Sequence, residues 1–330
     1  MSVTILALTV SAIVIYIACE LFVNAIEWVG VRFNISNNAV GTILAAFGTA
    51  LPESVVTFIA VVFGTNVAQK DIGVGAALGG PLVLSTIAYS VVGIGILMFR
   101  RRRSQGSQII LKDSKLGRDQ LWFMVIFIFK LGLGFIIFKG KALTGFLFLI
   151  AYGFYFYNEI KPSVQNETEA LEPLKFRPRT NRPETNWILL QTAFSLTLIA
   201  FSSQIFVKNL DSLSLAMGIA PHIVALFLSP IATELPEILN AIIWVRQGKE
   251  RLALANISGA MMIQATVPSA LGILFTPWLF DRYLAIAGVV TMLSIAFLWL
   301  TLQRRKLSVG RLAFAAAFYL LFIAAVIWPE

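Results

Sequence analysis

The chain has 330 residues, of which 58% are hydrophobic and 13% are charged, and its formal net charge is +9. A soluble domain has about 25% charged residues, so this composition excludes an ordinary soluble protein and indicates one that crosses a membrane several times. The single cysteine, Cys19, excludes an internal disulfide, and the single histidine, His222, argues against a zinc site.

Ten segments are long and apolar enough to cross a bilayer as helices, since a span needs about 20 such residues. In chain order they are roughly residues 3–27, 38–63, 72–99, 120–138, 141–158, 186–209, 220–246, 252–274, 279–302 and 309–328. No Lys or Arg precedes Arg32, so the first segment lacks the basic start of a signal peptide and is predicted to be retained. We therefore expect an all-α membrane protein with ten transmembrane helices.

The basic residues predict the orientation of these spans. The run Arg100–Arg103 is the strongest basic cluster, and the positive-inside rule puts its loop in the cytoplasm. Ten spans then leave both termini on the non-cytoplasmic side, and most of the 26 Lys and Arg residues fall in the loops expected inside. The membrane topology thus explains the positive charge, which does not indicate a nucleic-acid-binding surface. We expect a multi-pass protein of the plasma (inner) membrane of a prokaryote.

The two halves of the chain repeat each other. The line Thr49–Glu53 recurs as Thr233–Glu237, and paired glycines follow both copies. Hydropathy alone does not explain a paired Thr, Pro and Glu. Residues 1–158 are predicted to form a first five-helix repeat, 159–185 a cytoplasmic linker and 186–330 a second five-helix repeat. An odd number of spans makes the copies antiparallel, and inverted repeats with broken helices and a midplane site are typical of secondary transporters.

The repeated motif has the chemistry of a cation site. Glu53 and Glu237 are predicted near the membrane midplane, where a carboxylate is costly and is a functional hypothesis by default. The prolines before them free backbone carbonyls from the helix ladder. With the hydroxyls of Thr49 and Thr233, these groups form an all-oxygen cage for a hard cation. Calcium accepts such an irregular cage more readily than magnesium does, and a soft metal would need Cys, His or Met ligands.

Three further residues are candidate ligands with open alternatives. Glu234 precedes Glu237 by three residues, so the two carboxylates are neighbours on one helix face and one of them could accept a proton. The proline between them could instead turn Glu234 toward a vestibule. Asn256 and Gln264 are candidate polar ligands, although hydrogen bonds between helices would explain them equally well. The hydroxyls of Thr49 and Thr233 could likewise bond back to their own helices.

Some other residues are expected to have structural roles. Gly73, Gly75, Gly79 and Gly80 are explained by close helix packing. Lys130 lies within a span and is expected to snorkel or to pair. His222 is expected to be a plain interfacial residue, and the same holds for Asp211 at a predicted helix end.

The segments 46–53 and 231–237 resemble the motifs of the cation/calcium exchanger superfamily, which includes sodium/calcium and calcium/proton exchangers. The resemblance implies ten helices in two inverted halves and calcium held by Glu53 and Glu237. It also implies alternating access driven by a monovalent cation gradient, with the first and sixth spans sliding against the other eight. Ala50, Ala76 and Gly80 stand where the sodium exchangers have polar residues, whereas the stretch around Glu234 and Gln264 is closer to the proton-exchanging branch.

The sequence therefore predicts an antiporter that exchanges a divalent cation, most simply Ca²⁺, for H⁺ or Na⁺. The alternatives are an uncoupled cation channel and a related exchanger carrying Mg²⁺, Mn²⁺ or Na⁺. An enzyme is not expected, because no nucleophile, metal motif or phosphate loop is present. The expected partners are the lipid bilayer and the transported cations, without nucleic acid or cofactor, and the oligomeric state stays open.

Overall fold

A computed structural model describes residues 2–32, 37–99, 108–110, 115–159, 172–180, 182–246, 248–303 and 306–327. Within these ranges it describes no side chains at 30, 31, 37–49, 108–110, 115, 159, 236 and 306. The helices are α1 (Ser2–Arg32), α2 (Asn37–Val62), α3 (Val67–Val83), α4 (Tyr89–Phe99), α5 (Lys115–Leu133), α6 (Gly145–Glu159), α7 (Thr185–Met217), α8 (Pro221–Thr233), α9 (Leu235–Arg246), α10 (Glu250–Phe275), α11 (Arg282–Leu302), α12 (Val309–Phe314) and α13 (Ala316–Ile327). A π-helical turn, η1 (Leu84–Ala88), joins α3 to α4, and a 3₁₀ turn, η3 (Lys141–Thr144), precedes α6.

Seven helical stretches in the described part of the chain are long and apolar enough to cross a membrane. They are Ser2–Val29, Val67–Phe99, Thr185–Met217, Pro221–Arg246, Glu250–Phe275, Arg282–Leu302 and Val309–Ile327. The other three expected spans coincide with α2, α5 and α6. In α2 the side chains are described from Ala50 onward, and Ala50–Val62 is the apolar stretch among them. The helix α5 has charged residues in its first turns, and α6 has 15 residues. The ten-span layout therefore remains a proposal.

One expected span is displaced by several residues at both of its ends. The span expected at 120–138 is a helix from Lys115 to Leu133, and a turn with Gly140 at φ +84° follows it. Two three-residue strands were not expected at all: β1 (Gln108–Ile110) pairs antiparallel with β2 (Lys306–Ser308). Strands this short have no usable periodicity in the sequence.

The helix breaks expected at the two Pro-Glu motifs differ between the copies. In the second copy α8 ends at Thr233 and α9 begins at Leu235, with Glu234 between them at φ −97° and ψ −6°. A proline at position 236 explains this break, because it lacks an N–H and clashes with the carbonyl four residues earlier. In the first copy α2 runs unbroken through Pro52, so the expectation of a broken helix is wrong there.

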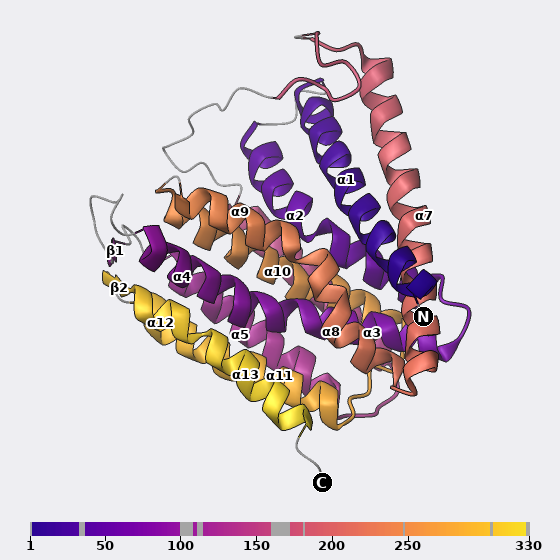
Figure 1. Ribbon diagram of the computed structural model, residues 1–330, viewed down its shortest axis with the longest axis vertical. Coiled ribbons are helices and arrows are strands. Elements are labelled where there is room, and N and C mark those ends of the chain that lie inside the picture. Colours follow the sequence, from indigo (N-terminus) through magenta and orange to yellow (C-terminus); the bar gives the residue numbers. More distant parts are fainter. Residues whose placement is uncertain are drawn as a thin grey trace.

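Two helices stand side by side along one flank of the molecule. Figure 1 shows α1 and α7 as a long pair, apart from the stack formed by α4, α5 and α10–α13. The helices that carry the repeated motif, α2 and α8–α9, lie between this pair and the stack. Accordingly, one apolar core joins α1, α2, α7 and α8, and a second fills the stack.

Glycines bring α3 against α8, as the sequence predicts. A Cβ atom at Gly75 would come within 2.1 Å of the His222 carbonyl oxygen, and one at Gly79 within 2.6 Å of the Leu226 carbonyl oxygen. No side chain fits in such gaps, so glycine is required for the two backbones to approach this closely.

Loop contacts fall into two groups that agree with the expected sidedness. The first group contains the pairing of β1 with β2 and the contacts between the end of α1 and the linker. In the linker contacts, the Trp28 indole donates to the Glu172 carbonyl at 3.0 Å, and the Arg32 guanidinium donates to the Thr185 hydroxyl at 2.7 Å. All these segments are expected in the cytoplasm.

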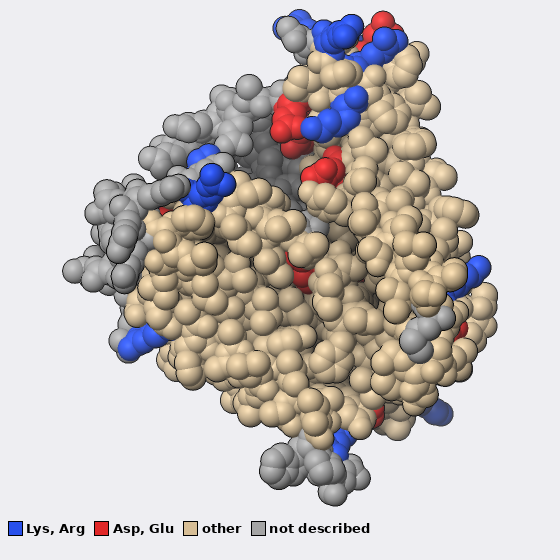
Figure 2. All heavy atoms as spheres, in the orientation of Figure 1, with Lys and Arg blue, Asp and Glu red and all other residues tan. Residues whose placement is uncertain are grey.

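The other group joins segments expected outside. The Asn66 amide donates to Asp211 at 3.1 Å, the Lys141 amine donates to the Trp278 carbonyl at 2.9 Å, and His222 contacts Asp281 at 2.7 Å. The interfacial roles expected for Asp211 and His222 agree with these contacts. In Figure 2 charged side chains gather at the margins of the visible face, whose broad middle is uncharged apart from acidic atoms in a central hollow.

Candidate functional site

Glu53 and Thr233 join the two repeats in the middle of the fold. The Glu53 side chain, on α2, is 0% exposed, and the Thr233 hydroxyl at the end of α8 donates to it at 2.6 Å. The same hydroxyl oxygen lies 3.0 Å from a carboxylate oxygen of Glu234 and 3.1 Å from the Ser229 carbonyl. A hydroxyl has one proton and can donate fully to one acceptor at a time. Two buried carboxylates therefore compete for one donor.

The carboxylates of this cluster have oxygens left over for a cation. Glu53 Oε1 and Glu234 Oε2 are buried without a hydrogen-bond partner among the described residues, and the same holds for the hydroxyls of Thr57 and Ser229. Buried polar atoms are normally paired, because an unpaired one costs about 1–3 kcal/mol. A set of unpaired oxygens around two acids is the arrangement that a hard cation would complete.

Glu237 is also fully buried, but it faces another helix. It begins the second half of the broken helix, three residues after Glu234, and interacts electrostatically with Tyr16 and Cys19 on α1. The hydroxyl of Thr233 contacts both Glu53 and Glu234, so Glu234 lies close to Glu53. The pairing of Glu53 with Glu237 expected from the sequence stays a prediction.

The remaining predicted ligands have different surroundings. Gln264 on α10 is fully buried, and neither atom of its amide completes a hydrogen bond among the described residues. Gly80 makes room for it, because a Cβ there would lie 2.8 Å from the Gln264 Oε1 atom. Asn256 is two turns earlier on α10, and no contact among the described residues ties it to the carboxylates. The side chain of Thr49 lies outside the described residues.

Sequence reasoning missed three polar neighbours of the site: Ser229, Thr57 and Lys130. Ser229 and Thr57 each lie one helical turn from a predicted ligand, Thr233 and Glu53 respectively, so the i, i+4 spacing could have indicated them. Lys130 does not snorkel as expected. Its side chain is 0% exposed, and its amine donates to the Ala77 carbonyl at 2.7 Å instead of reaching the membrane surface.

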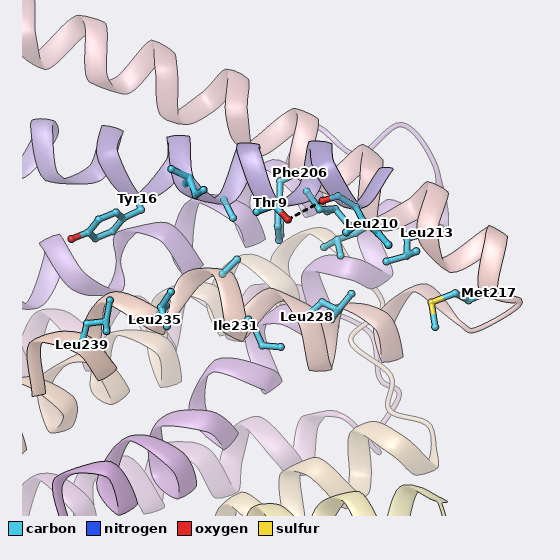
Figure 3. A pocket seen from close by; sticks show the side chains of 15 residues that line it. Thr9, Tyr16, Phe206, Leu210, Leu213, Met217, Leu228, Ile231, Leu235 and Leu239 are labelled. Atoms are coloured by element: carbon cyan, nitrogen blue, oxygen red, sulfur yellow. Dashed lines mark hydrogen bonds between the residues drawn. The ribbon is translucent and has the colours of Figure 1, made fainter. Parts of the chain in front are cut away.

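An apolar crevice separates the α1–α7 pair from the broken helix. Its volume is about 920 Å³, and side chains of α1, α7 and α8–α9 line it (Figure 3). Among them the Thr9 hydroxyl is bonded to the Ile5 carbonyl of its own helix at 2.9 Å, and the Tyr16 hydroxyl is bonded to Glu20 at 2.5 Å. None of its lining side chains is a carboxylate, so the crevice differs in chemistry from the acidic cluster.

Comparison with known proteins agrees with this geometry. The family model described as sodium/calcium exchanger protein matches residues 3–161 and 187–328. This chain belongs to that family. The family consists of membrane cation exchangers, so the protein is a transporter and not an enzyme.

Relatives of the exchanger include two bacterial membrane proteins. The putative antiporter CaxA of Alkalimonas amylolytica is 25% identical over 303 residues, which cover 88% of this chain and 87% of that one. The inner membrane protein YrbG of Escherichia coli is 24% identical over 281 residues, with 82% and 80% covered.

Two solved exchangers share its fold. The H⁺/Ca²⁺ exchanger CAX matches with a TM-score of 0.75 at 19% identity, covering 99% of this chain and 82% of that one. The sodium-calcium exchanger NCX_Mj matches with a TM-score of 0.60 at 20% identity, covering 99% of both. At these identities the likeness is one of fold.

Proposed function

We propose that this exchanger is a secondary antiporter that moves Ca²⁺ against a monovalent cation, at a site formed by Glu53, Thr233, Glu234 and Glu237. The observation that carries the proposal is the buried contact of Thr233 with Glu53 and Glu234, which links the two repeats through oxygen ligands. Gln264 is a further ligand from α10, and Thr49 and Asn256 complete the proposed set.

The chemistry of this set favours calcium among the divalent ions. Carboxylate, hydroxyl and amide oxygens are hard ligands, and calcium accepts six to eight of them at irregular angles, whereas magnesium keeps its water and demands an octahedron. The named relatives support the same cargo, because one solved structure of this fold is an H⁺/Ca²⁺ exchanger and another is a sodium-calcium exchanger.

We propose H⁺ ahead of Na⁺ as the counter-ion. Glu53 and Glu234 share one hydroxyl donor, so the carboxylate that does not receive it is left without a donor. A proton bound to either acid would supply this missing donor. A sodium ion needs several neutral oxygens, and alanine or glycine stands at positions 50, 76 and 80.

Alternating access would use the α1–α7 pair as the moving part. The two helices pack along each other, and the apolar crevice keeps much of their length away from α8 and α9. In this proposal ten helices form the inverted repeats 1–158 and 186–330, joined by the linker 159–185. Both termini lie on the non-cytoplasmic side of a prokaryotic plasma membrane.

The test is uptake of calcium-45 into proteoliposomes, with a pH gradient and a Na⁺ gradient imposed separately. We expect uptake driven by the pH gradient, and we expect Glu53→Gln and Glu234→Gln each to reduce it at least tenfold while the purified variants stay monodisperse. Glu172→Gln is the matched control, because Glu172 is an exposed acid of the linker. Uptake at channel rates without any counter-ion gradient, or full uptake in either site variant, would refute the proposal.

A further inference from the structure

The last part of the linker lies against the end of α1 and the start of α7 (Figure 1). Its Leu174 side chain is 0% exposed and packs with Ala25 of α1 and Ile188 of α7, and these three buried side chains form a small apolar core of their own. Burial of a leucine between two helices holds the linker on both of them. This segment is therefore packed as part of the α1–α7 pair.

Two buried amides, Asn24 on α1 and Gln191 on α7, bind the main chain of the same segment. The Asn24 side-chain oxygen accepts from the Lys175 N–H at 3.0 Å, and its amino group donates to the Pro173 carbonyl at 3.3 Å. The Gln191 side-chain oxygen accepts from the Phe176 N–H at 2.9 Å. The two amides are 5% and 0% exposed, so water has little access to replace these partners.

The same amides also join α1 directly to α7. The Gln191 amino group donates to the Leu21 carbonyl at 2.8 Å and to the Asn24 side-chain oxygen at 3.0 Å. Each amide thus uses both its oxygen and its amino group, as a buried amide must to offset its lost hydration. Because these bonds connect α1, α7 and the linker, moving any one of the three away leaves buried polar groups unpaired on the other two.

The described contacts of this segment outside the linker are made with the long pair. Among the described residues, its hydrogen bonds beyond the linker go to α1 and α7. Nearby, the Arg32 guanidinium donates to the Thr185 hydroxyl at 2.7 Å, which links the same two helices. The far end of α7 is different, because there Asp211 accepts at 3.1 Å from Asn66, the residue that caps α3.

We infer that residues 172–176 are a strap that fastens α1 to α7, with Asn24 and Gln191 as its positioning residues, so that the two helices move as one body during transport. The inference rests on the proposed function, in which this pair moves against the other helices. Contacts within the strap then persist through the cycle, whereas the contact of Asp211 with Asn66 has to break.

Two thiol cross-links distinguish motion within the pair from motion of the whole pair. All variants carry Cys19→Ala, which removes the single native thiol. Arg32→Cys with Thr185→Cys joins α1 to α7, and Asn66→Cys with Asp211→Cys joins α7 to the start of α3. Each purified protein is treated with a short bifunctional methanethiosulfonate, checked by intact mass and reconstituted for calcium-45 uptake under the counter-ion gradient.

The two cross-links should have opposite effects on uptake. The α1–α7 cross-link should leave the rate within about twofold of the untreated variant. The α7–α3 cross-link should lower it by about tenfold or more, and a reductant should restore it. Both pairs replace side chains that are in contact, so they are matched in design.

Loosening the strap is the complementary test. Asn24→Leu and Gln191→Leu remove the amides and keep apolar bulk, so uptake should slow by about tenfold with an unchanged half-saturating Ca²⁺ concentration. Adding the α1–α7 cross-link to either variant should restore the rate. Asn209→Leu is the matched control, because that amide of α7 donates to the Ile205 carbonyl of its own helix at 2.8 Å.

The possible outcomes separate the strap from the proposed function. A block of uptake by the α1–α7 cross-link would overturn the inference and leave the exchange intact, and this result does not depend on whether the amide variants fold. Full uptake in both amide variants would overturn it as well. Full uptake with the α7–α3 cross-link would show that the pair does not move. Absence of gradient-driven uptake in the wild type would instead defeat the proposed function.

Discussion

At the residue scale the site depends on one hydroxyl proton. Thr233 is the only described residue that contacts both Glu53 and Glu234 through hydrogen-bond geometry, and it sits where α8 ends. In the proposed site, a proton on either carboxyl, or a cation between them, would change which acid accepts the Thr233 proton. We therefore propose that the threonine couples the charge of Glu53 to that of Glu234.

Thr233→Val tests this role, because valine keeps the shape and loses the hydroxyl. A hydrogen bond to a charged group contributes about 1.5–3 kcal/mol, so exchange should fall by roughly 10- to 100-fold. Thr233→Ser should retain most of the activity. Thr197→Val is a suitable control, because that hydroxyl is exposed and bonded to its own helix at Ala193. Initial rates of calcium uptake are the measurement, and an unchanged rate in Thr233→Val would remove the hydroxyl from the mechanism.

Some of these residues could be predicted from the sequence and others could not. Repetition of the motif pointed to Glu53, Glu237 and Thr233, because a paired acid and hydroxyl in an apolar segment is conspicuous. Glu234, whose counterpart is Ala50, was a candidate only through its spacing from Glu237. Lys130 was expected to snorkel or to pair, and its partner could not be identified from the sequence, because the Ala77 carbonyl is 53 residues away in the chain. A lone lysine in an apolar run gives no sign of whether it reaches the membrane surface or a carbonyl inside the fold.

At the element scale the two copies of the motif accommodate their proline with different backbone conformations. Both contain Pro-Glu, yet α2 is continuous and α8–α9 is broken at Glu234. One proline in a helix interior costs about 3 kcal/mol and can be accommodated by a kink or by a break. Which of these occurs depends on tertiary packing. Here α3 lies against α8 through glycines, and this packing fixes the first half of the broken helix.

Gly79→Ala measures how much that contact matters. The added methyl group would lie 2.6 Å from the Leu226 carbonyl oxygen, so α3 and α8 must separate, at a cost of about 1–3 kcal/mol for overpacking. We expect a lower thermal unfolding midpoint in detergent. Gly153→Ala is the control, since a Cβ at Gly153 meets nothing within 4 Å. Equal unfolding midpoints for the two variants would show that α3 and α8 can separate without a loss of stability.

At the scale of the whole molecule, hydropathy predicted where helices occur, and charge assigned each loop to one side of the membrane, which stays a prediction. Every expected span contains a helix that covers most of its described residues. Pairings such as β1 with β2, and Asn66 with Asp211, join loops assigned to one side. The arrangement of the helices in space was beyond the sequence alone, because lipid-facing and core-facing apolar residues look alike. The apolar crevice between α1, α7 and α8–α9 shows this, since its lining residues are as apolar as a core.

The sidedness itself is open to a direct test with single cysteines. After Cys19, which is buried, is replaced by alanine, Thr180→Cys places a thiol in the exposed linker and Leu215→Cys places one near the far end of α7, where Leu215 is 77% exposed. A membrane-impermeant maleimide added to intact cells should label position 215 and not position 180, because the linker is proposed to be cytoplasmic. In permeabilised cells both should react, which shows that the two thiols are reactive. Labelling of position 180 alone in intact cells would show that the topology is the reverse of the proposed one. Most Lys and Arg residues would then lie outside, contrary to the positive-inside rule.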